Sequence, residues 1–166
     1  MNLYIRKAEL SDAPKIADIH IRSWIFAYSN SVPMEIIEKQ NSKRHVMWQN
    51  MLANNADSTY VICENNDIVG FLGINTPREN FSADIYELSG LYLEPECIGK
   101  GFGRFAMEWT KKEVKSRGYK GIYLWVLDTN YRAKKFYKKS GFKPDGGVKP
   151  SGLGDTKEER YIINFD

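Results

Sequence analysis

The sequence predicts one mixed α/β domain, and three observations support this prediction. The chain has 166 residues, which is the usual length of a single domain. Hydrophobic residues make up 42% and aromatic residues 13%, so a core can form and a disordered chain is excluded. Helical spacing of apolar residues dominates the early part, and strand-type runs with a strand–glycine turn–helix unit dominate the rest. We therefore treat residues 1–166 as one domain.

The N-terminal region is predicted to be mainly helical. Residues 3–7 alternate well enough for a short strand, and Ser11 is the expected N-cap of the helix that follows. This helix is apolar on two sides, which is typical of a helix that is mostly buried or that covers a ligand site. Pro33 opens a second helical stretch and Ser42 a third, which ends near Asn54.

Strands are predicted in the middle of the chain. Residues 59–64 and 68–74 are rich in strand formers, and the turn residues 65–67 between them predict an antiparallel hairpin. Residues 77–82 form a loop, and residues 84–93 form a third strand in the middle of the sheet. The later elements are expected in this order: a helix to Arg117, a buried strand at 122–127, a helix from Asn130 to Ser140, a long Gly/Pro loop at 143–157 and a strand at 161–165.

A glycine turn joins the third strand to its helix. Gly99, Gly101 and Gly103 allow positive φ angles and close backbone approach. The free N–H groups of the first helical turn then converge, and the helix dipole adds positive charge. This arrangement predicts a phosphate or pyrophosphate site, with a tight turn that binds nothing as the alternative.

The residues around the turn limit the classes of phosphate-containing ligand that it could bind. A Walker A loop is excluded because Lys100 is followed by Gly101 rather than by Ser or Thr. A dinucleotide site would use the first βαβ unit and an acidic residue after the next strand. The turn comes late in the chain, but Asp128 keeps this second interpretation open.

Composition excludes several classes of protein. The 24 basic and 21 acidic residues leave a net charge of +3, which is too small to indicate nucleic-acid binding. The N-terminus lacks a signal-peptide core and no run is long enough to span a bilayer, so we expect a cytoplasmic protein without a membrane partner. Cys63 and Cys97 fit neither a disulfide scaffold nor a zinc site, and no metal is expected.

Two motifs in order resemble those of the GNAT N-acetyltransferase superfamily. Residues 87–95 followed by 99–103 resemble its acetyl-CoA motif. The opening residues 5–8 and the closing residues 159–161 also fit, so the resemblance covers nearly the whole chain. The second motif is matched by Leu124-Trp125-Val126, Asn130, Arg132-Ala133, Phe136-Tyr137 and Gly141-Phe142.

The resemblance implies a central twisted mixed sheet of about six to seven strands flanked by helices, a count typical of the sheets of such domains. It also implies acetyl-CoA held between two splayed strands, here 87–93 and 122–127, with Gly90 as a bulge that opens the first. Ile98 departs from the family pattern, which has Gln or Arg there. The implied cofactor-binding residues are Leu91, Tyr92 and Leu93 for pantetheine, Gly99, Lys100, Gly101, Phe102, Gly103 and Arg104 for pyrophosphate, and Asn130, which is also an N-cap.

Two residues are candidates for the chemistry that the resemblance implies. Glu87 is the candidate base for the amine, and partial burial on its strand face would raise its pKa; an ordinary solvent-facing or salt-bridged strand glutamate is the alternative. Tyr137 is the candidate acid for the departing thiolate; a core aromatic beside Phe136 is the alternative. No covalent nucleophile is evident, so the amine would attack directly in a ternary complex.

The acceptor remains open at this point. The family builds its acceptor pocket from the first helix, which makes Trp24 and Tyr28 candidate substrate-binding residues, with core packing as the alternative. A polyamine, an aminoglycoside, an amino acid, a peptide N-terminus and a protein lysine all fit. Other candidate functions are a CoA-binding module without catalysis and a nicotinamide-linked oxidoreductase. The final strand and the loop around Gly146 and Gly147 are a candidate homodimer contact.

Overall fold

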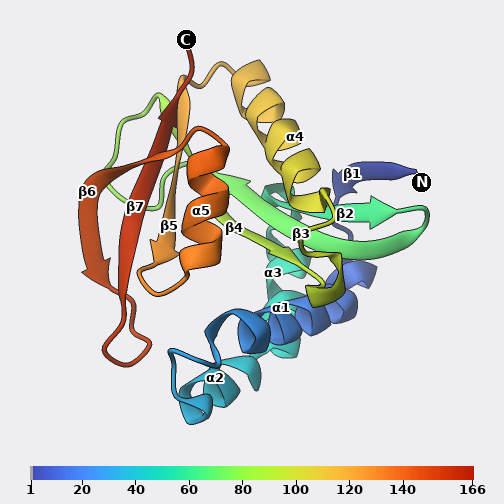
Figure 1. The fold of residues 1–166 in the computed structure, drawn as a ribbon. Coiled ribbons are helices and arrows are strands. Elements are labelled where there is room, and N and C mark those ends of the chain that lie inside the picture. The colour runs from blue at the N-terminus through green and yellow to red at the C-terminus, as the bar shows by residue number, and fades with distance from the viewer. Residues whose placement is uncertain (1) are drawn as a thin grey trace. The chain divides into compact units, whose positions relative to one another are not determined.

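The structure is a computed structural model that describes residues 2–166. The chain divides into two compact units: Met1–Gly73 with Gly90–Ala106, and Ile74–Ser89 with Met107–Asp166. Strand β4 and helix α4, which are labelled in Figure 1, each contribute residues to both units. The single domain predicted for residues 1–166 stays a prediction.

The elements confirm a mixed α/β fold. The described residues form one seven-stranded mixed sheet in the order β1-β2-β3-β4-β5-β7-β6. The helices are α1 (Ala13–Tyr28), α2 (Met34–Asn41), α3 (Arg44–Asn54), α4 (Phe102–Ser116) and α5 (Tyr131–Lys139). The strands are β1 (Leu3–Lys7), β2 (Thr59–Glu64), β3 (Asp67–Asn75), β4 (Ile85–Leu93), β5 (Gly121–Leu127), β6 (Lys143–Pro150) and β7 (Lys157–Asn164).

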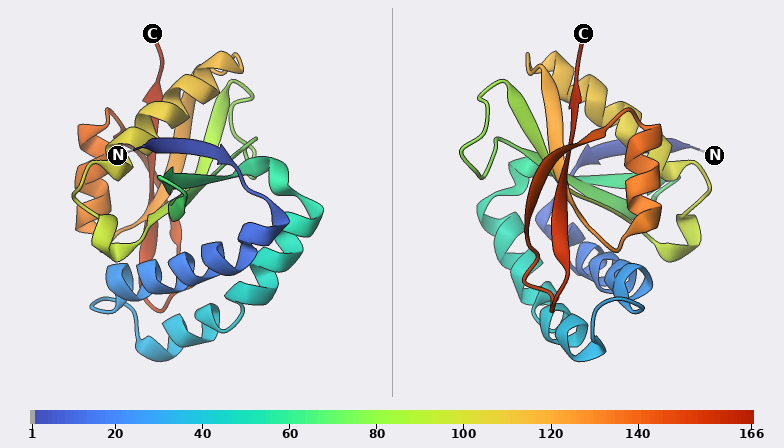
Figure 2. Two further views of the ribbon diagram at one scale, coloured as in Figure 1. Left: turned by 90° about the vertical axis from the view of Figure 1, so that its right-hand side faces the viewer. Right: turned by 60° about the vertical axis from the view of Figure 1, so that its left-hand side comes forward.

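In the first unit, helices α1 and α3 lie side by side (Figure 2) and pack on the antiparallel strands β1, β2 and β3. The predicted hairpin is confirmed as β2 and β3. Apolar side chains spaced three or four residues apart on each helix build the core, because that spacing places them on one helix face. The core includes Ile16, Ile19, Trp48, Leu52 and Phe71.

The start of α1 differs from the prediction. The predicted cap, Ser11, is an exposed residue in a short 3₁₀ turn (Leu10–Asp12), and the helix begins at Ala13. Asp12 organises this entry instead: its Oδ2 accepts from the Glu9 backbone N–H at 2.8 Å, and Arg6 donates to both carboxylate oxygens at 2.8 and 3.0 Å. The charged acceptor outcompetes the serine hydroxyl because charge-assisted hydrogen bonds are the stronger ones.

In the second unit, β5 is central. The start of β4 pairs with it in parallel, from Ile85↔Gly121 to Glu87↔Tyr123, and β7 pairs with it antiparallel along its whole length. Helix α5 begins as predicted, since Asn130 Oδ1 accepts from the Ala133 backbone N–H at 3.2 Å.

The loop predicted at 143–157 is wrong over its first half, which forms strand β6 paired with β7. Strand β7 accordingly begins at Lys157 rather than at residue 161. Strand β6 is the last in the sheet order, and an edge strand tolerates proline and glycine. Its register shifts between Pro144 and Val148, where Gly146 has a φ of +90°. The residues that indicated a loop are therefore those that shape a bulged edge strand.

Candidate active site

The glycine turn before α4 has the geometry of an anion cradle. Gly99 and Gly101 have φ angles of +81° and +91°, and a Cβ at either position would meet no atom within 4 Å. Glycine is therefore needed for the backbone angle and not for space. The Phe105 N–H donates to the Gly101 carbonyl at 3.0 Å, so the preceding N–H groups of residues 102–104 have no partner inside the helix. Such groups are suited to hold a phosphate.

The side chains of this turn divide into anchors and exposed cations. Phe102 is buried and fixes the start of α4 in the first unit, so only its backbone is available to a ligand. Lys100 and Arg104 are exposed. Ile98, at the position where a polar side chain was expected from the family pattern, is half-buried. Anion binding here thus depends on backbone N–H groups, with two exposed cations nearby in sequence.

The second half of β4 presents alternating backbone groups. The Glu94 N–H donates to the Val69 carbonyl at 2.8 Å, and a Cβ on Gly70 would lie 2.6 Å from the Tyr92 carbonyl oxygen. The Tyr92 backbone therefore faces β3. Because successive residues of a strand direct their N–H and C=O groups to opposite edges, Leu91 and Leu93 face the other edge. These two residues are the ones whose backbone can accept a borrowed strand.

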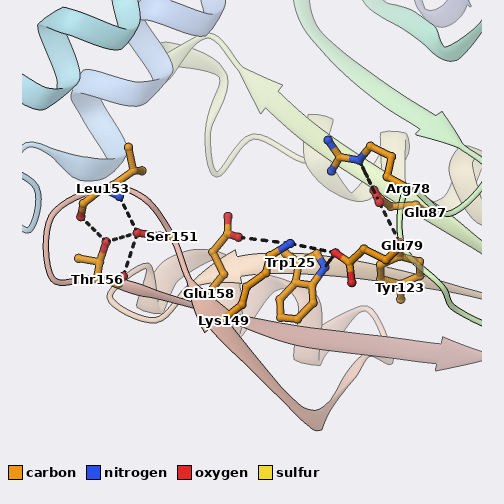
Figure 3. A network of polar contacts seen from close by, with 10 residues as sticks. All are labelled: Arg78, Glu79, Glu87, Tyr123, Trp125, Lys149, Ser151, Leu153, Thr156 and Glu158. Atoms are coloured by element: carbon orange, nitrogen blue, oxygen red, sulfur yellow. Dashed lines mark hydrogen bonds and ion pairs between the residues drawn. The ribbon is translucent and has the colours of Figure 1, made fainter.

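Glu87, in the second unit, is buried with 1% of its surface exposed. Arg78 Nε donates to its two oxygens at 3.1 and 2.7 Å, and the Tyr123 hydroxyl donates to Oε1 at 2.9 Å (Figure 3). Burial and the neighbouring carboxylate raise the pKa of Tyr123, so its hydroxyl keeps its proton and remains a donor. The carboxylate is thus both buried and fixed in orientation.

A second set of contacts is built around Glu79, which also acts electrostatically on Tyr123 (Figure 3). Glu79 accepts from Trp125 Nε1 at 2.8 Å and from Lys149 Nζ at 2.9 Å. Lys149 also lies over the Trp125 ring, 4.2 Å from its centroid. The hydrogen bond and charge of Lys149 lower the pKa of Glu79. Arg78 and Glu79 belong to the segment predicted as a plain loop, and sequence reasoning did not find them.

Tyr137 and Asn130 belong to α5 in the second unit. The Tyr137 ring is half-buried, 5.9 Å from Phe142 and 5.4 Å from Phe136 between ring centroids. Phe136 is itself only half-buried, and Phe142 is the buried ring. Asn130 uses Oδ1 for its cap, so a contact with a cofactor would have to use Nδ2.

Trp24 and Tyr28 lie on α1 in the first unit, with ring centroids 5.1 Å apart in an edge-on contact. Both are half-buried. The guanidinium of Arg44 lies over the Trp24 ring at 4.3 Å, a cation–π contact that sequence reasoning missed. A cation in the first turn of α3 opposes the helix dipole, and this unfavourable placement is the signal that could have identified Arg44.

The predicted site residues thus divide between the units. The first holds Trp24, Tyr28, Leu91–Leu93 and the glycine turn, and the second holds Glu87, Asn130 and Tyr137. Among residues 2–166, no helix is long and apolar enough to cross a membrane. Within the same residues, no group of three or more His, Cys, Asp or Glu side chains is placed to bind a metal ion.

Comparison with known proteins gives a consistent result. The chain is 27% identical over 146 residues to an uncharacterized N-acetyltransferase of Archaeoglobus fulgidus, covering 86% of this chain and 95% of that protein. It is 26% identical over 149 residues to a spermidine N(1)-acetyltransferase of Thermoplasma acidophilum, covering 86% and 89%. The crystal structure of the PaiA N-acetyltransferase from Thermoplasma acidophilum, in complex with coenzyme A, superposes with a TM-score of 0.81 at 23% identity, covering 99% of this chain and 100% of that one.

The family assignment follows from the matched segment. The family described as "Acetyltransferase (GNAT) family" matches residues 15–142, which include most of α1, the glycine turn and α5. This chain therefore belongs to the GNAT acetyltransferase family.

Proposed function

We propose that the protein transfers the acetyl group of acetyl-CoA to a primary amine, which attacks directly while both substrates are bound. The observation that carries the proposal is the Gly99–Gly101 turn at the start of α4, within the segment that matches the GNAT family. Its positive φ angles leave the first N–H groups of the helix directed outward, as a pyrophosphate requires. Membership of an acetyltransferase family supports the reaction class.

The cofactor-binding groups are assigned as follows. Backbone N–H groups of residues 102–104 bind the pyrophosphate, and the exposed side chains of Lys100 and Arg104 add positive charge. The outward-facing backbone of Leu91 and Leu93 pairs with the pantetheine amides as a strand would. Asn130 donates from Nδ2 while its Oδ1 keeps the cap of α5.

Glu87 is proposed to accept the acceptor's proton. An alkylammonium has a pKa of about 10 and must lose a proton before its nitrogen can attack the thioester that acetyl-CoA supplies. Arg78 and Tyr123 hold the carboxylate in one orientation, through three hydrogen bonds of 2.7–3.1 Å. Glu87 takes the proton directly or through water.

Tyr137 is proposed to donate a proton to the sulfur as the carbon–sulfur bond breaks. Phenols and thiols in water are acids of similar strength, so proton transfer from a tyrosine to a departing thiolate is nearly balanced. Tyr137 then regains its proton from solvent. Its ring is held against the buried ring of Phe142, 5.9 Å away, which limits the positions of the hydroxyl.

The acceptor binds beside Trp24 and Tyr28 in this proposal. Both rings are half-buried on α1, so each can present an aromatic face to an amine. A relative named spermidine N(1)-acetyltransferase makes spermidine one compound to test. Amino acids, peptides and aminoglycosides complete the panel.

The test combines binding and turnover. Acetyl-CoA should raise the melting temperature more than NAD or ATP at equal concentration, because binding to the native state alone stabilises it. Release of CoA thiol should depend on an amine from the panel. Stabilisation without release for any amine would indicate a CoA-binding protein without catalysis, and equal stabilisation by all three nucleotides would contradict the cofactor assignment.

A matched pair of glycines tests the cradle itself. Gly101 and Gly118 have similar φ angles of +91° and +87°, and a Cβ on either would meet nothing within 4 Å. Alanine at each should cost a similar amount of stability, about 1–2 kcal/mol. Only Gly101→Ala should weaken acetyl-CoA binding in calorimetric titration, since Gly101 belongs to the turn before α4 and Gly118 does not. Equal affinities of the two variants would make the turn purely structural.

A further inference from the structure

Three side chains on α1 and α3 form a group in the first unit, here named the donor cluster: the buried His20 and Arg44 and the half-buried Trp24. His20 and Arg44 are 6% and 7% exposed. The Arg44 guanidinium lies 4.3 Å from the Trp24 ring, and the ring centroids of His20 and Trp24 are 5.8 Å apart. The three side chains are therefore neighbours in one part of the molecule.

The donor cluster has an unusual excess of hydrogen-bond donors. Buried Nε and Nη2 of Arg44, Nε1 of Trp24 and Nε2 of His20 have no hydrogen-bond partner anywhere in residues 2–166. Trp48 Nε1 donates to His20 Nδ1 at 2.9 Å, which places the imidazole hydrogen on Nε2. All four unpartnered atoms are thus donors. Buried polar groups normally have partners, so this concentration is a feature to be explained.

The electrostatics of the cluster favour an anion. Burial lowers the pKa of His20 to about 3, so the imidazole is neutral and Arg44 supplies a single positive charge. Arg44 is also the first residue of α3, where the helix dipole is positive and stabilises anions rather than cations. The fold supplies this guanidinium with the cation–π contact to Trp24 and a 4.0 Å contact from Nη1 to Met47 Sδ, and neither contact neutralises its charge.

The surroundings connect the cluster to the proposed cofactor strand. The Tyr92 ring on β4 is 4.7 Å from His20 and stacks on Phe71 at 5.1 Å, both measured between ring centroids. Tyr92 lies between Leu91 and Leu93, whose backbone groups are assigned to pantetheine. The cluster is therefore adjacent to the strand on which the acetyl donor is proposed to bind.

We propose that the donor cluster binds a carboxylate of the acceptor, so that the preferred acceptors are amines that also bear a carboxylate, such as amino acids or peptides. The Nε and Nη2 atoms of Arg44 form the edge of a guanidinium that matches the two oxygens of a carboxylate. A carboxylate also balances the single charge, whereas a phosphate carries between one and two negative charges. The identity of the bound molecule as the acceptor rests on the proposed acetyltransferase function.

Binding is tested without turnover. Melting temperatures of the full chain are measured with phenylacetate, phenethylamine or inorganic phosphate at matched ionic strength. Phenylacetate, at about 100 times its Kd, should raise the melting temperature by roughly 5–10 °C, and phenethylamine and phosphate should not. Equal effects of phenylacetate and phenethylamine would overturn the proposal, and so would an equal effect of phosphate.

Variants then locate the effect. Arg44→Met should abolish the shift with phenylacetate, and Lys43→Met, which removes a neighbouring exposed charge, should preserve it. If Arg44→Met does not fold, Trp24→Phe decides, because it keeps an aromatic ring beneath Arg44, although a smaller one, and removes the Nε1 donor. The proposal would be overturned if folded Arg44→Met kept the full melting-temperature shift with phenylacetate. If Arg44→Met does not fold, the same result for folded Trp24→Phe would overturn it.

Kinetics assigns the carboxylate to the acceptor. Amino acids are compared with their amides, which keep the amine and lack the carboxylate charge. Arg44→Met should lower kcat/KM for the acids about 10- to 100-fold and change it only a few-fold for the amides, as expected for lost hydrogen bonds to a charged group. Amides that are better substrates than acids in the unaltered protein would overturn the assignment.

The two proposals fail in distinguishable ways. Acetyl-CoA is included in the same melting experiment. A shift with phenylacetate but none with acetyl-CoA would contradict the acetyltransferase function and leave the carboxylate site standing. A shift with acetyl-CoA, together with turnover of polyamines and no shift with phenylacetate, would support the acetyltransferase function and contradict the carboxylate site.

Discussion

Glu87 in the second unit and Arg44 in the first are both charged side chains with less than a tenth of their surface exposed, yet their surroundings differ. Glu87 receives hydrogen bonds from Arg78 and Tyr123. Arg44 stacks on Trp24 and leaves Nε and Nη2 without partners. A buried charge with its partners supplied by the fold is positioned in advance, whereas one without them is better suited to an arriving partner. The contrast is the one expected between a group proposed to perform chemistry and a group proposed to recognise a ligand.

The largest expected effect is on Glu87. Glu87→Gln keeps the size of the side chain and an oxygen that accepts from Tyr123, but it removes the proposed base. Turnover should fall by about 10²–10⁴-fold near neutral pH and recover partly at higher pH, where more of the acceptor amine is already neutral. The measurement is the pH–rate profile. Glu79→Gln, in the neighbouring contacts with Trp125 and Lys149, is the control, and an unaltered profile for Glu87→Gln would remove it from the mechanism.

A comparable loss is expected for Tyr137→Phe. The ring and its contact with Phe142 are kept, so affinity for acetyl-CoA should stay within a few-fold while turnover falls by about 10²–10⁴-fold. Tyr123→Phe is the matched variant. It removes a buried hydrogen bond to Glu87 and should lower the free energy of unfolding by about 1–3 kcal/mol. If Tyr137→Phe instead lost stability and kept its turnover, its hydroxyl would be structural like that of Tyr123.

Removing Arg44 should increase stability, whereas Tyr123→Phe should decrease it. Arg44→Met replaces a buried charge whose Nε and Nη2 lack hydrogen-bond partners by an apolar chain of similar length, so the free energy of unfolding should rise by about 1–4 kcal/mol. Urea denaturation of the protein without ligands measures this directly. A loss of stability would mean that the cation–π contact with Trp24 compensates for the burial of Arg44, and the contrast with Glu87 would then disappear.

The smallest effect concerns the pH dependence of stability. Burial depresses the pKa of His20 from 6.5 to about 3, so between these values the unfolded chain binds the proton more readily than the native one. Its contribution to stability is complete above pH 6.5 and is lost as the pH falls toward about 3, with a slope of at most about 1.4 kcal/mol per pH unit. His20→Gln, which can still accept from Trp48, should remove this slope. His45→Gln, at an exposed histidine paired with Asp18, should leave it unchanged, and identical slopes in both variants would exclude His20 as the cause.

The fold could be predicted where the local chemistry is unambiguous. The hairpin of β2 and β3, the turn before α4 and the Asn130 cap depend on nearby residues whose preferences agree, and all three are confirmed. Strand β6 was missed because the proline and glycine that indicate a loop are also tolerated at the edge of a sheet, and only the sheet order reveals that edge.

The candidate site was predictable to a different extent. Glu87 could be chosen from its motif, but Arg78 comes from a segment without secondary structure, and nothing in its spacing indicates that it pairs with Glu87. Arg44 could be recognised as a cation at the wrong end of a helix, but its stacking on Trp24 depends on how α3 packs against α1. Contacts between elements distant in sequence are set by packing, and single-sequence patterns do not encode them.

The close approach of β4 to Gly70 has a consequence for how the gene tolerates change. A Cβ at this position would lie 2.6 Å from the Tyr92 carbonyl oxygen and 2.7 Å from a Leu93 methyl carbon. Any other residue must displace β4, and with it the backbone of Leu91 and Leu93. In a saturation survey of substitutions scored by growth or by product, position 70 would therefore behave like an active-site codon, although its residue has no side chain to contribute to catalysis. Intolerance at position 70 would reflect the short distance between the backbones of β3 and β4 rather than a chemical role.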